Sequence, residues 1–80
     1  MKDNMTRLAR LGAIQEKRQA LAVLEVQIDR LAKDLSLAVF MDSGVESIDI
    51  TAARIHFAEL CSKVDKYNNL KAEIKRLENV

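Results

Sequence analysis

Apolar residues recur with a seven-residue period along the first half of the chain. Two rows, three residues apart, carry the pattern: Ile14, Leu21, Ile28 and Leu35, then Lys17, Leu24, Leu31 and Ala38. Such rows are the core positions of a coiled-coil heptad, and they predict one long helix over about residues 5–39. The pattern weakens before Ile14, where Gly12 interrupts it. We therefore expect the first ten or so residues to fray, or the helix to bend at Gly12.

A second periodic stretch predicts a helix over about residues 51–78. Its rows are Phe57, Val64 and Lys71, then Leu60, Tyr67 and Ile74, with Leu70 and Leu77 flanking them. Thr51 is the expected N-cap, because its hydroxyl can accept a hydrogen bond from the first turn, and Asp49 is the alternative. The chain has no proline, so both helices can run without interruption.

The connection between the helices covers about residues 40–50. Ser43 and Gly44 are typical of a turn, and Ser43 and Glu46 have the spacing of a capping box, which favours a single helical turn here. We expect Val45, Ile48 and Ile50 to cover the end of the structure. A role for this segment in binding a partner is the alternative interpretation.

The two helices fit together as one antiparallel hairpin, so the predicted fold class is all-α with a single domain over residues 1–80. Pairing residues whose numbers sum to about 91 places Ile14 opposite Leu77 and Leu24 opposite Tyr67. Lys17 then meets Ile74, with its stem along the contact and its ammonium outside. Ile28 and Leu35 fall one residue out of this register, opposite Val64 and Phe57.

The first helix carries more apolar surface than one neighbouring helix can cover. Burial of apolar surface is worth about 25 cal/mol per Å², and contiguous exposed patches mark contact sites. We therefore expect a second copy to complete a four-helix bundle as a homodimer, with a different protein partner as the alternative. The candidate interface residues are Leu21, Val23, Leu24, Val26, Ile28 and Phe40.

Charge is unevenly distributed although the formal net charge is only +1. Residues 1–20 sum to +3, residues 21–60 to −4 and residues 61–80 to +2. A hairpin brings the two basic segments to its open end and leaves the connection end acidic. Two copies with their connections at opposite ends would set basic ends beside acidic ones, so we expect an antiparallel dimer.

The basic open end raises a second functional hypothesis, a small nucleic-acid-binding regulator. Basic clusters attract phosphates, although the chain has only three aromatic residues for stacking on bases. The candidate phosphate-contacting residues are Arg7, Arg10, Lys17, Arg18, Lys75 and Arg76.

No residue pattern predicts catalysis, a metal site or a cofactor. His56 and Glu59 share a helix face but lack further inward carboxylates for a metal, and Cys61 is the only cysteine and has no base beside it. The N-terminus lacks the apolar segment of a signal peptide and no run approaches about 18 apolar residues. We expect a cytoplasmic, noncatalytic protein-protein interaction module: an adaptor, small chaperone or regulatory subunit.

Overall fold

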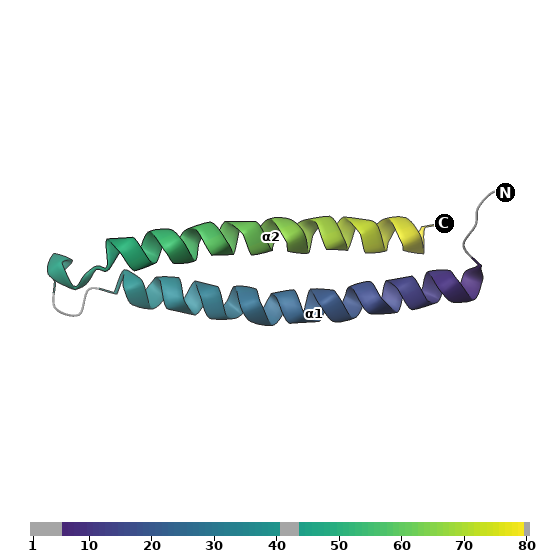
Figure 1. The fold of residues 1–80 in the computed structure, drawn as a ribbon, viewed down its shortest axis with the longest axis horizontal. Coiled ribbons are helices and arrows are strands. Elements are labelled where there is room, and N and C mark those ends of the chain that lie inside the picture. The colour runs from purple at the N-terminus through teal and green to yellow at the C-terminus, as the bar shows by residue number, and fades with distance from the viewer. Residues whose placement is uncertain (1–5, 41–43, 80) are drawn as a thin grey trace.

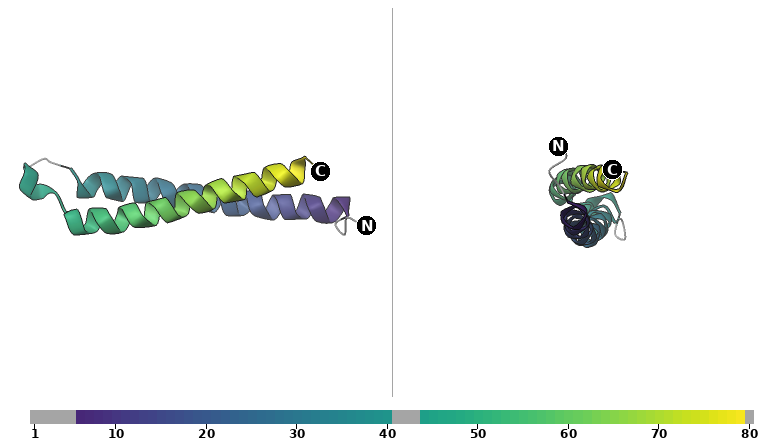
Figure 2. Two further views of the ribbon diagram at one scale, coloured as in Figure 1. Left: turned by 90° about the horizontal axis from the view of Figure 1, so that it is seen from above. Right: turned by 90° about the vertical axis from the view of Figure 1, so that its right-hand side faces the viewer.

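The computed structural model describes residues 6–40 and 44–79, and every regular element in those two segments is helical. Helix α1 spans Arg7–Ala38, a 3₁₀ turn spans Val45–Ser47, and helix α2 spans Ile50–Glu78. The two long helices run side by side in opposite directions (Figure 1). They cross at a shallow angle when seen from above (Figure 2). The predicted helical hairpin is thus confirmed, and it measures 63 × 16 × 15 Å.

Helix α1 begins with a side-chain cap and runs through Gly12 without a break. The Thr6 hydroxyl accepts a hydrogen bond from the Ala9 amide at 3.1 Å, which satisfies one of the free N–H groups of the first turn. Gly12 therefore does not interrupt the helix. A single glycine costs only about 1 kcal/mol, and the turns on either side remain helical. Residues 1–5, where fraying was also expected, lie outside the described residues.

Short-range hydrogen bonds order the connection after α1. The Ser47 hydroxyl oxygen lies 2.8 and 2.7 Å from the carbonyl oxygens of Phe40 and Gly44, and its single proton can be donated to either of them. Gly44 has φ of +95°, in the left-handed region that favours glycine. The expected helical turn is present as Val45–Ser47, whereas Ser43 lies outside the described residues. Val45 does not cover the hairpin end, because it remains 72% exposed.

Asp49 caps α2, and the expectation of Thr51 as the N-cap is wrong. The Asp49 carboxylate accepts from the Ala52 amide at 3.0 Å, and its own amide donates to the Ala38 carbonyl at 2.8 Å. One residue therefore caps α2 and ties it to the end of α1. The carboxylate also interacts favourably with the positive end of the helix dipole, which the Thr51 hydroxyl cannot do. Ile50 enters the first turn of α2 and stays exposed.

The helices meet along a seam of buried and half-buried residues with strict heptad spacing. On α1 the seam comprises Ile14, Lys17, Leu21, Leu24, Ile28, Leu31, Leu35 and Ala38. On α2 it comprises Ala53, His56, Leu60, Lys63, Tyr67, Leu70, Ile74 and Leu77. When the two rows are paired in antiparallel order, the two residue numbers of each pair sum to 91. Ile28 is thus paired with Lys63, and Leu35 with His56, so the one-residue offset expected at Ile28 and Leu35 is absent.

The expected core row of Phe57, Val64 and Lys71 is wrong, because all three residues are exposed. Tyr67, Leu70 and Ile74 face α1 and so determine the phase of α2, that is, the rotation of this helix about its own axis. Continuing that phase toward the connection puts Lys63 and His56 into the seam and turns Val64 and Phe57 out of it. The polar side chains thus occupy seam positions while neighbouring apolar ones lie outside.

Candidate functional site

The six candidate interface residues divide into two groups in the structure. Leu21, Leu24 and Ile28 lie half-buried in the seam, where α2 already covers one side of them. The other three, Val23, Val26 and Phe40, are exposed. The unpartnered apolar surface of the hairpin is therefore made of residues outside the seam.

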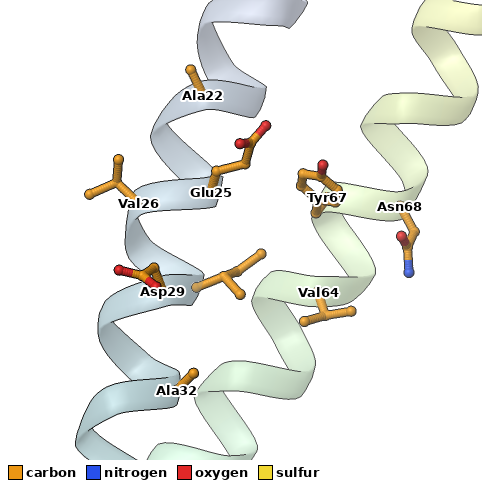
Figure 3. Close-up of a pocket in the computed structure, with 9 residues that line it drawn as sticks. Ala22, Glu25, Val26, Asp29, Ala32, Val64, Tyr67 and Asn68 are labelled. Atoms are coloured by element: carbon orange, nitrogen blue, oxygen red, sulfur yellow. The ribbon is translucent and has the colours of Figure 1, made fainter.

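A shallow groove of about 980 Å³ lies beside the middle of the seam (Figure 3). The residues that line it are Ala22, Glu25, Val26, Ile28, Asp29 and Ala32 from α1, and Val64, Tyr67 and Asn68 from α2. Figure 3 shows the Tyr67 ring pointing from α2 toward α1, with Val64 about one turn away on α2. The groove is thus a channel between two helices, with apolar walls and two carboxylates on the α1 side.

The apolar surface extends from the groove toward the connection. Seven residues make two helical turns and return to nearly the same side of a helix. Val39 follows Ala32 by seven residues, Phe57 precedes Val64 by seven, and both are exposed. We call the side of the hairpin that bears the groove, Val39 and Phe57 the groove side. Sequence reasoning missed its α2 half, because Phe57 and Val64 were assigned to the core.

The opposite side of the hairpin has only polar residues and alanine in the two rows next to the seam. These rows are Ala13, Ala20, Gln27 and Asp34 on α1, and Ala52, Glu59, Lys66 and Glu73 on α2. No apolar side chain larger than alanine stands in either of these rows. Farther from the seam on this side, Val23, Leu37 and Ile55 are exposed. The two flanks therefore differ in the rows next to the seam, where the groove side has the larger apolar side chains.

The six candidate phosphate-contacting residues surround the open end of the hairpin but do not form one site. Arg7, Arg10 and Arg18 line one hollow together with Leu77 and Glu78. Lys75 lines a second hollow beside Arg18, and Arg76 lines a third beside Lys17. The positive charges are thus distributed around the circumference of the end.

Two of these cations are held by acidic residues. The Lys17 ammonium donates to the Glu73 carboxylate at 2.8 Å, and Arg18 forms an ion pair with Glu78. The hydrogen bond from Lys17, together with its positive charge, holds the pKa of Glu73 below its ordinary value. Both ion pairs bridge the two helices, so these charges already serve to join α1 to α2.

The titratable residues near the connection form no recognisable chemical site. His56 lines a hollow with Asp34 and Asp49, and its Nδ1 atom is buried without a hydrogen-bond partner among the described residues. Cys61 is a free, exposed thiol. In residues 6–40 and 44–79 no three His, Cys, Asp or Glu side chains are grouped closely enough to hold a metal ion.

No protein-family model, curated protein or solved structure matches this chain. Neither α1 nor α2 contains an apolar stretch long enough to cross a membrane.

Proposed function

We propose that this protein is a noncatalytic interaction module that works as a homodimer, with two hairpins forming a coiled-coil-like four-helix bundle. The observation that carries the proposal is the near absence of a core. In the described residues only Ile14 and Ile74 are buried, while twelve large apolar side chains are exposed. A stable small domain needs more apolar burial than this.

The surface area of the chain supports the same conclusion. The hairpin exposes 6118 Å², whereas a compact protein of its 9.0 kDa mass exposes about 4,900 Å². The excess is about 1,200 Å² per chain, and a standard protein-protein interface buries about 800 Å² per partner. One interface of ordinary size would thus bring the exposed surface to that of a compact protein.

A bundle of this kind would act as an adaptor, small chaperone or regulatory subunit. Its remaining exposed residues would offer helical faces to other proteins. The exposed free thiol of Cys61 fits a reducing compartment, so we place the protein in the cytoplasm.

Light scattering at several protein concentrations tests the proposal. We expect a mass of twice 9.0 kDa at micromolar concentrations. A mass of 9.0 kDa at the highest attainable concentration would exclude the homodimer, and a different protein would then have to cover the groove side.

A nucleic-acid-binding regulator remains the alternative proposal, and Arg7 and Arg10 favour it. Neither residue forms an ion pair with another described residue. Binding of RNA or DNA that weakens with salt, and that is lost in the double variant Arg7→Ala with Arg10→Ala, would support this alternative. The interaction-module proposal expects no such binding at physiological salt.

A further inference from the structure

We propose that the second copy docks on the groove side, with the two connections at opposite ends and Arg18 beside Asp29 of the second copy. This inference rests on the proposed self-association and adds the face, the direction and the register of the contact. Three features of the hairpin support it: the chemistry of its two flanks, the positions of the charges on the groove side, and the length of overlap.

The groove side is the flank that can exclude water from an interface. Ala32, Val39, Phe57 and Val64 lie there in two adjacent rows, one from each helix. These two rows also carry Arg18, Glu25, Lys71 and Glu78, but the corresponding rows of the opposite side contain no apolar side chain larger than alanine. Docking on the opposite side would desolvate Asp34, Glu59 and Lys66, and would leave the groove-side apolar residues exposed. Apolar burial therefore selects the groove side.

Charges on the groove side are segregated along the hairpin axis. Three cations, Arg18, Lys71 and Lys75, line one hollow near the open end, with Glu78 as the accompanying anion. The Lys71 ammonium also lies 5.6 Å from the centre of the Tyr67 ring, at the edge of the groove. Glu25 and Asp29 line the groove itself, nearer the connection. Asp29 also forms an ion pair with Lys33 of the same helix at 2.9 Å. The surface that a partner meets thus has a net positive charge toward the open end and two carboxylates at the middle.

This segregation selects the direction of the second copy. With both connections at the same end, the three cations of one hairpin would face the three cations of the other. Like charges in close contact are unfavourable, most of all where water is excluded. With the connections at opposite ends, the cationic hollow of each copy moves toward the acidic groove of the other.

One register satisfies both charge and overlap. In this arrangement a two-fold axis perpendicular to the hairpins relates the two copies. For Arg18 of one copy to lie beside Asp29 of the other, the axis must pass midway between these positions, which is between Val23 and Leu24. Because α1 spans Arg7–Ala38, this point is also within about one residue of the middle of α1. The hairpins then overlap along nearly their whole length. The same axis sets Val39 opposite Leu8 of the second copy, and both side chains are exposed in the single hairpin.

Replacing one alanine on each side of the hairpin by glutamate tests which side forms the dimer interface. Ala32→Glu adds a carboxylate inside the groove, and Ala20→Glu adds one on the opposite side; both residues are exposed and lie on α1. Glutamate is nearly as good a helix former as alanine, so the single hairpin should tolerate both changes. We expect Ala32→Glu to weaken dimerisation at least tenfold in sedimentation, and Ala20→Glu to change it less than twofold.

The possible results distinguish failure of the proposed interface from failure of the proposed dimerisation. If wild type is a dimer and Ala32→Glu dimerises equally well, the groove side is not the interface, although the interaction module stands. Disruption by Ala20→Glu alone would place the interface on the opposite side. A monomeric wild type overturns both proposals. Circular dichroism of each variant would show that the helices are retained.

Distances between spin labels test the direction. A single label at Glu46→Cys, in a background of Cys61→Ser, marks the connection end of each copy. We expect a label separation approaching the 63 Å length of the hairpin. A separation within the width of two hairpins, each 16 × 15 Å across, would put both connections at one end and overturn the proposed direction.

Discussion

The Lys17 ammonium leaves the seam to meet the Glu73 carboxylate, with Nζ and Oε1 2.8 Å apart. Lys17 occupies a core position of the heptad, yet its charged group reaches the polar side of the hairpin while its stem stays half-buried. The ion pair joins the two helices near the open end, and Arg18 with Glu78 joins them on the other flank. The two pairs thus add a contact on each flank of the apolar seam at this end.

The Lys17–Glu73 pair predicts a specific change in carboxyl titration. Lys17→Met keeps the stem but removes the donor and the charge, so the pKa of Glu73 should rise toward its ordinary value. Carboxyl carbon chemical shifts measured across acidic pH would report this directly. An unchanged pKa would mean that the ion pair does not persist in solution.

The lowered pKa also fixes the sign of the pH dependence. A carboxyl whose pKa is lower in the folded state stabilises the fold above its unfolded pKa. That contribution is lost as pH falls through the folded pKa. Wild type should therefore lose more stability than Lys17→Met on acidification. Equal losses in urea unfolding at neutral and acidic pH would contradict this.

The two glycines should respond oppositely to alanine. Neither Gly12 nor Gly44 has an atom within 4 Å of the position that a Cβ would take. A steric clash therefore does not explain any difference between the two alanine variants. Gly12 lies inside α1, where Gly12→Ala should stabilise by about 0.5–1 kcal/mol. Gly44 has φ of +95°, so Gly44→Ala should destabilise by about 1 kcal/mol. Thermal unfolding at one fixed protein concentration compares them, and changes of the same sign would contradict the account.

His56 predicts a stabilising substitution in the seam. Its Nδ1 atom is buried without a partner among the described residues, and an unsatisfied buried polar group costs about 1–3 kcal/mol. His56→Leu should raise the midpoint of urea unfolding by an amount equivalent to about 1 kcal/mol. His56→Gln keeps a polar group there and should not. A lower midpoint for His56→Leu would show that the ring makes a contact worth keeping.

The heptad of the first half made α1 and the hairpin predictable. Its rows from Ile14 to Ala38 follow one spacing without a competing pattern, and the observed seam of α1 uses the same rows. The phase of α2 was harder to predict, because two apolar rows compete near its start. Phe57 and Val64 are better core residues than His56 and Lys63 by type. The strict register with α1 nevertheless decides which row faces inward.

The candidate site was only partly predictable for the same reason. The excess of apolar surface around Val26 followed from the sequence of α1. The groove requires Val64 and Tyr67 on α2 as well, and its extension requires Phe57, so it depends on the phase of the second helix. The caps were equally local choices: Asp49 and Thr51 are both good cap residues, and only the path of the connection distinguishes them.

The concentration dependence of thermal unfolding tests the central claim most directly, because folding completed by a second copy must follow mass action. The wild-type chain should show a melting temperature that rises steadily when its concentration is increased a hundredfold. A melting temperature that stays constant over that range, with cooperative loss of helix, would show that one hairpin is stable alone and would contradict the account.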